Sequence, residues 1–197
     1  MAETTTEEEK AKVLRARAKA AEEECFKKGA KVEVNFNEPG FKGSWYTGTI
    51  LNSGGIINTK RRPNKIHIQF DTLSSSSDHA QFRPLKEFVD LIFVRPAPPR
   101  EARRSFQLSE EVDAFHKDGW WEGVVTAVHP PPSVGSIIAG TSYSVFFRST
   151  REQIQFPESD LRLHREWVYG KWVPPLESSS SSSSTSVPPS SSARLNL

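Results

Sequence analysis

Two short stretches decide the fold of this 197-residue chain: GSWYTGTI at residues 43–50 and DGWWEGVV at residues 118–125. In each stretch an aromatic pair follows a glycine, and a second glycine leads into a β-branched pair. Aromatic and β-branched residues flanked by turn-forming glycines are typical of β-strands. The repetition indicates one small β unit that is used twice.

The sequence around these stretches repeats in the same order, with loops of different length between the matching parts. The matching segments are 32–34 with 112–114, 66–70 with 143–147, and 94–95 with 161–162. Short strands separated by turns, with no alternating helices between them, favour an all-β barrel or sandwich. We therefore expect an all-β fold made of two small, strongly bent barrels in tandem.

Composition sets the boundaries of these units. We expect a charged helical lead-in at residues 1–25, a first module at 26–99, a linker at 100–105, a second module at 106–175 and a disordered Ser/Pro tail at 176–197. Thr6 with Glu9 fits a helix capping box, which favours the helix at the start. The serine tract of the tail cannot bury enough apolar surface to offset the entropy of ordering.

The bulk properties indicate a soluble, intracellular protein that we expect to be a monomer. The formal net charge is only +2, and the single cysteine, Cys25, excludes an intrachain disulfide. No apolar run approaches the roughly 20 residues needed to span a bilayer, so no membrane partner is expected. The five histidines lack metal-ligand spacing. No catalytic constellation is recognisable, and we expect neither an enzyme nor a cofactor.

Four segments together resemble the plant Agenet domain, a relative of Tudor domains among the small barrels that read methylated peptides. They are VEVNFNEPGFKGSWYTGTI (32–50), PLKEFVDLIFVRPAPP (84–99), VDAFHKDGWWEGVV (112–125) and LRLHREWVYGKWV (161–173). The resemblance implies two tandem Tudor-like barrels of an Agenet pair. It also implies a chromatin- or RNA-linked binding module in the nucleus, without catalysis, whose partner is a methylated histone tail.

A Tudor-type cage holds a methylated ammonium against two to four aromatic faces, each worth about 0.5 to 2 kcal/mol when well placed. Mapped by position, the wall residues of the first module are Phe36, Tyr46 and Phe70, with Trp45 beside them. Asp71 is the candidate carboxylate, which would favour lower methylation states that keep an N–H to donate. Leu73 stands where Tudor domains often have a further aromatic residue.

The second module offers its own candidate wall, made of Phe115, Trp120, Trp121 and Phe147. His116 stands where the first module has Phe36. Arg148 replaces Asp71, and its positive charge disfavours a cation at that place. We therefore expect the first module to hold the better cage.

Core packing is the alternative interpretation of these aromatic residues, because small barrels need large side chains to fill their interiors. We expect Trp45 and Trp120 to be core residues. Tyr46 and Trp121 lie on the opposite face of their strands by alternation, where they either pack or contact a ligand.

Two other functions remain open. Lys60, Arg61, Arg62 and Lys65 form a basic run, which is either a solvated loop between strands or a contact for RNA or DNA. The tandem could also be a protein-interaction scaffold that binds an unmodified partner in the groove between its modules.

Overall fold

The computed structural model describes residues 24–36, 38–52, 56–59, 62–76, 81–99, 104–131 and 140–176. The elements in this part of the chain are strands and two single-turn 3-10 helices. The expected helix at residues 1–25 and the serine-rich tail lie almost wholly outside the described residues. The helical lead-in is therefore not confirmed, whereas the all-β prediction is.

The first half of the chain contains six strands and one 3-10 turn. They are β1 (Lys31–Val34), β2 (Ser44–Ile50), β3 (Ile56–Thr59), β4 (Arg62–Ser74), β5 (Pro84–Asp90), η1 (Leu91–Phe93) and β6 (Val94–Pro96). Strand β1 pairs antiparallel with β2 on one side and with β6 on the other. Strand β4 continues the sheet from β2 and pairs in turn with β3 and β5.

The second half repeats this pattern and adds a hairpin. Its elements are β7 (Glu111–His116), β8 (Gly119–His129), β9 (Ser142–Phe147), β10 (Glu152–Pro157), η2 (Glu158–Asp160), β11 (Leu161–Leu163), β12 (Glu166–Val168) and β13 (Lys171–Val173). Strands β7, β8, β9, β10 and β11 take the places of β1, β2, β4, β5 and β6. Strands β12 and β13 pair only with each other among the described strands.

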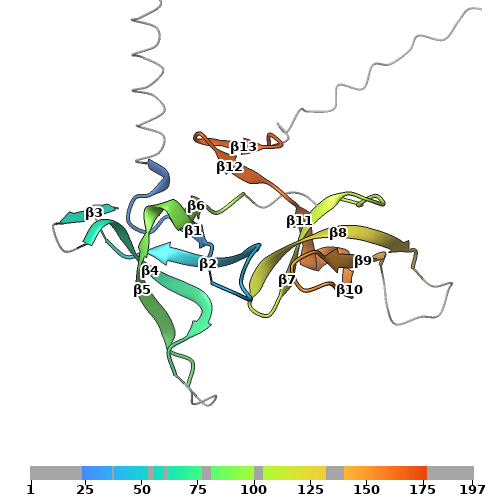
Figure 1. Ribbon diagram of the computed structural model, residues 1–197, viewed down its shortest axis with the longest axis horizontal. Coiled ribbons are helices and arrows are strands. Elements are labelled where there is room, and N and C mark those ends of the chain that lie inside the picture. Colours follow the sequence, from blue (N-terminus) through green and yellow to red (C-terminus); the bar gives the residue numbers. More distant parts are fainter. Residues whose placement is uncertain are drawn as a thin grey trace, which may run out of the picture.

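The two halves join through their equivalent second strands. Trp45 of β2 lies opposite Trp120 of β8, and Ser44 lies opposite Trp121. The amide of Glu122 donates a 2.9 Å hydrogen bond to the carbonyl of Gly43, which lengthens this ladder. Equivalent residues of the two modules therefore lie opposite each other, related by a local two-fold axis. Through this ladder the described strands other than β12 and β13 form one continuous sheet (Figure 1).

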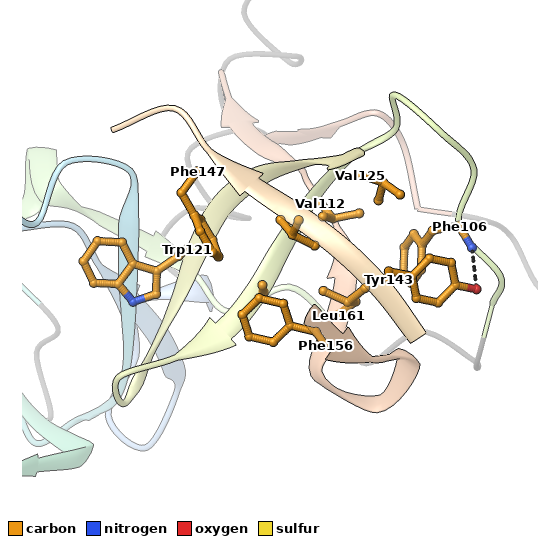
Figure 2. Packing of buried hydrophobic residues seen from close by; sticks show 10 residues of the cluster. Phe106, Val112, Trp121, Val125, Tyr143, Phe147, Phe156 and Leu161 are labelled. Carbon is orange, nitrogen blue, oxygen red and sulfur yellow. Dashed lines mark hydrogen bonds between the residues drawn. The ribbon is translucent and has the colours of Figure 1, made fainter. Parts of the chain in front are cut away.

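Each half has its own hydrophobic core. The first is made of Phe26, Val32, Val34, Tyr46, Ile50, Ile66, Ile68, Phe70 and Val94. The second is made of Phe106, Val112, Ala114, Trp121, Val125, Tyr143, Val145, Phe147, Phe156 and Leu161 (Figure 2). In the second core the hydroxyl of Tyr143 accepts a 3.2 Å hydrogen bond from the amide of Phe106.

Two glycines let the second strand of each module approach its neighbour. A Cβ at Gly48 would lie 2.5 Å from Cγ2 of Ile68 and 2.9 Å from the carbonyl oxygen of Gln69. A Cβ at Gly123 would collide with the side chain of Val145. The repeated glycine after each aromatic pair is therefore required by close packing between strands.

The prediction that Trp45 and Trp120 are the core residues of the two aromatic pairs was wrong, because the structure buries the other member of each pair. Tyr46 is 3% exposed and Trp121 is 7% exposed, and both belong to the cores. Trp45 and Trp120 lie half-buried on the other face of the ladder. The physical reason is strand parity: Tyr46 shares its face with Gly48 and Ile50, and Ile50 is buried in the first core.

Candidate ligand-binding site

The three aromatic residues predicted for the first module do come together. The ring centroid of Phe36 lies 5.4 Å from that of Tyr46 and 5.5 Å from that of Phe70. Phe70 is fully buried, so it packs behind the other rings. The alternative of core packing therefore holds for Phe70.

Sequence reasoning missed Phe41, which supplies the outer part of this aromatic cluster. Its ring centroid lies 6.1 Å from Phe36 and 6.2 Å from Tyr46, and the residue is 39% exposed. Phe41 lies in the turn between β1 and β2, outside any strand, where alternation carries no information.

A cavity of about 350 Å³ opens beside these rings, and both modules contribute to its mostly apolar wall. The first module provides Gly40, Phe41, Tyr46 and Leu73, and the second provides His116, Lys117, Trp121, Phe147, Thr150 and Glu152. Trp121 and Phe147 lie at the end of the second core that faces the first module (Figure 2). The indole nitrogen of Trp121 donates a 2.7 Å hydrogen bond to the carbonyl of His116, which fixes the ring.

Carboxylates lie close to this cavity. Glu152 is an exposed residue of its wall, and the wall also contains the positive charge of Lys117. Burial raises the pKa of Tyr46, and the negative charge of Asp118 raises it further, against the opposing hydrogen bond to Ser44. The phenol of Tyr46 therefore stays neutral at physiological pH and presents an uncharged ring.

Asp71 does not belong to this site, contrary to the prediction. Both of its carboxylate oxygens accept hydrogen bonds of 2.8 Å from Nζ of Lys31, on the outer face of the sheet. The reason is again alternation, because Phe70 points into the core and the next residue must point away.

Arg148 takes the place of Asp71 in the second module and forms the equivalent pair with the charges exchanged. Its guanidinium donates to Oε1 of Glu111 at 3.1 Å and 3.2 Å, and also lies 3.8 Å from Glu122. The first module has a lysine on its first strand, and the second has a glutamate at that place. The contrast between Asp71 and Arg148 therefore says nothing about which module binds a cation.

The candidate aromatic residues of the second module divide between two faces. Trp121 and Phe147 line the cavity, with His116 stacked on Phe147 at a centroid distance of 6.2 Å. Phe115 packs edge-on against Trp120 at 5.2 Å, on the opposite face of β7 and β8. Phe115 and Trp120 therefore do not reach the cavity, because they have the wrong parity along their strands.

Trp45 and Trp120 cover a buried cluster of charges that the sequence analysis did not predict. The guanidinium carbon of Arg95 lies 3.6 Å from the ring centroid of Trp45, and that of Arg162 lies 4.2 Å from the ring centroid of Trp120. Such stacking is favourable electrostatically and shields the cation from water. Both tryptophans thus pack against arginine rather than within a hydrophobic core.

The acidic partners of these arginines come from the first strand of each module. Nε of Arg95 donates a 3.0 Å hydrogen bond to Glu33, and Nε of Arg162 donates a 3.0 Å hydrogen bond to Asp113. Arg162 also reaches across to Glu33, with hydrogen bonds of 2.6 Å and 3.0 Å. Glu33, Arg95 and Asp113 are almost fully buried, so this charge cluster ties the two modules together.

His164 completes the cluster, with Nδ1 lying 2.6 Å from Oδ1 of Asp113. Burial alone would lower the pKa of His164, but the hydrogen bond and negative charge of Asp113 outweigh it and raise that pKa. Burial alone would raise the pKa of Asp113, yet the hydrogen bond from His164 and the nearby Arg162 lower it.

A second hollow, a groove of about 800 Å³, lies between the modules beside Trp45. Its lining includes Asn35, Lys42, Trp45, Ile92, Arg95, Glu122, Arg148, His164, Glu166 and Trp167. Ile92 is 84% exposed there. The lining of this groove contains both charged and apolar side chains, unlike the mostly apolar wall of the smaller cavity.

The remaining candidates are less informative. Lys60 and Arg61 lie outside the described residues, and Nζ of Lys65 lies 3.3 Å from a carboxylate oxygen of Asp90. The nucleic-acid contact therefore stays a prediction. No group of metal-ligating side chains is found within the part of the chain that the structure describes. Nor does any helix there have the length and apolarity to cross a membrane.

Comparison with known proteins agrees with this geometry. The family model described as "Agenet domain" matches residues 29–99. A protein of Arabidopsis thaliana named AGENET DOMAIN (AGD)-CONTAINING P1 is 41% identical over 157 residues, which cover 78% of this chain and 28% of that protein. The chain therefore spans about a quarter of the length of this relative.

Two solved structures share the arrangement of the tandem. The crystal structure of Arabidopsis thaliana AGDP1 AGD34 is 30% identical with a TM-score of 0.61, covering 79% of this chain and 93% of that one. The ADCP1 tandem Agenet domain 3-4 is 29% identical with a TM-score of 0.57, covering 80% and 91%. The fold and the cavity define a tandem of Tudor-like barrels. The chain belongs to the Agenet domain family.

Proposed function

We propose that this chain is a binding module for a methylated lysine side chain, presented by a histone tail in the nucleus, and that it has no catalytic role. The observation that carries the proposal is the small cavity whose wall includes Phe41, Tyr46, Trp121 and Phe147. A carboxylate, that of Glu152, lies at the same wall.

The chemistry of this wall suits a methylated ammonium better than other ligands. Aromatic faces attract a cation, and the attraction grows when water is excluded. An apolar wall favours burial of methyl groups, about 0.8 kcal/mol for each buried carbon. An unmodified lysine keeps a tightly held hydration shell and would lose it on entry without gaining the methyl contacts.

The proposal is tested with an array of methylated and unmodified histone-tail peptides, followed by calorimetry on the best binder. Phe41→Ala should lower the affinity by about 0.5 to 2 kcal/mol, because it removes one face of the cation site. Phe115→Ala is the matched control, since Phe115 is 38% exposed, close to the 39% of Phe41, and lies on the opposite face. Equal affinity for methylated and unmodified peptides would contradict the proposal.

The large groove supports a second candidate, a scaffold that binds an unmodified protein segment. Its volume of about 800 Å³ and the exposed Ile92 favour this function. In that case Ile92→Asp should abolish binding of a partner peptide, whereas Phe41→Ala should not. Peptide binding that ignores methylation and depends on Ile92 would select the scaffold over the reader.

A further inference from the structure

We propose that an extended segment of another protein binds along the free edge of β12, where it adds a third, antiparallel strand to the β12–β13 hairpin. The segment carries an apolar residue that faces the large groove and, directly after it, a basic residue that lies beside Glu166. This inference goes beyond the methyl-lysine site. It rests on the second candidate function, since it gives the large groove a partner and a mode of binding.

The hairpin leaves one amide and one carbonyl of β12 outside its ladder. Its two-residue turn has positive φ at both positions, 48° and 76°, as a type I′ turn requires. Val168 and Lys171 flank this turn and exchange ladder hydrogen bonds, so the next pair, Trp167 and Trp172, does not. The amide and carbonyl of Trp167 therefore point away from β13. No other hydrogen bond of Trp167 is found among the described residues.

The free edge of β12 faces the large groove. All three residues of β12 (Glu166, Trp167 and Val168) line the groove, whereas none of its described lining residues comes from β13. Successive side chains of a strand point to opposite faces, so a groove against one face of the hairpin would meet alternate residues of both strands. Contact with every residue of one strand alone indicates contact with its edge. The amide and carbonyl of Trp167 therefore open into the groove.

The hairpin stands apart from the other strands, but it is fixed to them through Arg95 (Figure 1). Nη1 of Arg95 donates a 2.7 Å hydrogen bond to the carbonyl of Arg165, at the start of the hairpin. The guanidinium carbon of Arg95 lies 3.6 Å from the ring centroid of Trp45 and 5.4 Å from that of Trp172. The edge is therefore preformed, and a ligand strand would bind without the entropic cost of ordering the hairpin first.

The side of the hairpin that carries Trp167 defines the first ligand residue. In an antiparallel ladder, the residue opposite Trp167 exchanges both hydrogen bonds with it and places its side chain on the same side. That side chain would enter the groove, whose lining includes Trp45 and the 84% exposed Ile92. An apolar residue suits this position. Proline does not, because it has no N–H to donate to the carbonyl of Trp167.

Glu166 defines the second ligand residue. The residue that follows the apolar one lies opposite Glu166 in a pair without hydrogen bonds, where Cβ atoms are about 4.5 to 5.5 Å apart. Glu166 is exposed and has no ion-pair partner among the described residues. Opposite charges across a ladder are favourable, so a lysine or arginine complements this position. The partner is therefore an extended segment in which a basic residue directly follows an apolar one.

A library of random eight-residue peptides, displayed on phage and selected on the full chain, tests the proposal. The selected peptides should share an apolar residue followed by lysine or arginine. They should bind the Ile92→Asp variant at least about ten-fold more weakly, because an apolar contact is lost. Ile92 is exposed, so the change should leave the fold intact. If no selected peptide depends on Ile92, the second candidate function fails and the inference fails with it.

Backbone methylation of the best selected peptide tests the strand itself. Methylating the amide of the apolar residue removes the N–H that donates to Trp167 and should lower the affinity about ten-fold. Methylating the amide of the basic residue is the matched control, because that N–H points away from β12 and the affinity should not change. Equal affinities of the two methylated peptides for the chain, or selected peptides with proline at the apolar position, would overturn the inference and leave the second candidate function intact.

Two further measurements locate the bound peptide. Glu166→Gln should weaken binding roughly two- to five-fold, the range of an exposed charge interaction. In nuclear magnetic resonance spectra of the labelled chain, the amide of Trp167 should shift downfield on binding, whereas that of Trp172, at the opposite edge, should not. A shift of Trp172 alone would place the peptide on β13. A loss of binding with Phe41→Ala would place it in the small cavity, and either result would overturn the inference.

Discussion

Arg162 and Glu33 lie 129 residues apart in the chain, yet the guanidinium of one donates two hydrogen bonds, of 2.6 Å and 3.0 Å, to the carboxylate of the other. The pair crosses from the second module to the first. Glu33 is 1% exposed, so water cannot replace its partners. Relative motion of the modules would separate these buried charges, which makes the tandem one mechanical unit.

Glu33→Gln should therefore be strongly destabilising. The change leaves Arg95 and Arg162 with only Asp113 to compensate them, and breaking a buried ion pair typically costs about 3 to 5 kcal/mol. Glu111→Gln is the matched control, because Glu111 pairs with Arg148 at an exposed site and should cost less than about 1 kcal/mol. Urea denaturation of both variants measures the difference. Equal losses would show that the buried cluster does not hold the fold together.

The stability of the chain should decline as the pH rises above neutrality, because of His164. Its pKa in the folded state is raised above the ordinary 6.5. A raised pKa contributes stability that is fully present below about pH 6.5 and is lost as the pH rises through the folded value. His164→Gln should flatten this slope when unfolding free energies are compared between about pH 5.5 and pH 8.5. An unchanged slope in the variant would exclude His164 as its source.

Asp113 produces the opposite dependence at acidic pH. Its folded pKa is lowered from the ordinary 3.8, so its contribution is present above that value and is lost as the pH falls through the lower one. Asp113→Asn should remove this acidic loss of stability. Acid titrations followed by tryptophan fluorescence would measure it in both proteins. If the variant lost stability at the same acidic pH as the wild-type protein, Asp113 would not be the group responsible.

Gly48→Ala and Gly123→Ala should both destabilise the chain, by about 1 to 3 kcal/mol, the range for overpacking. The added methyl would press on Ile68 in the first module and on Val145 in the second. Because the two glycines occupy equivalent places, the effects should be similar in size, and thermal unfolding can compare them. A neutral Gly→Ala change at either position would mean that the strands can separate without cost.

Much of the fold could be predicted because the signal is local. Alternation in residues 31–36 and 66–70 indicated strands, and the structure places β1 and β4 there. The repeat also predicted the equivalence of the halves. Residue size alone did not show which member of each aromatic pair points into the core. The sequence did contain a signal, because Ile50 lies on the same face of the strand as Tyr46 and an isoleucine favours the buried face.

The site was harder to predict because it depends on contacts between modules. Asp71 was predicted to be the carboxylate of the cage from its position next to Phe70 in the sequence. The carboxylate in the cavity wall is instead that of Glu152, which lies 81 positions further along the chain. Phe41 lies in a turn, where no periodicity applies. The buried cluster did leave a trace in the sequence, since Glu33 matches Asp113 and Arg95 matches Arg162. That these two pairs meet is shown only by the contacts between the modules in the folded chain.

The two modules carry equivalent surface ion pairs with opposite polarity: Lys31 with Asp71, and Glu111 with Arg148. This difference affects whether strands of the two similar modules pair with the correct partners during folding. If the first strand of one module docked into the barrel of the other, Lys31 would face Arg148, and Glu111 would face Asp71. Like charges brought this close together repel each other and are destabilising. The reversed polarity therefore penalises misassembly between the copies and leaves correct pairing favoured.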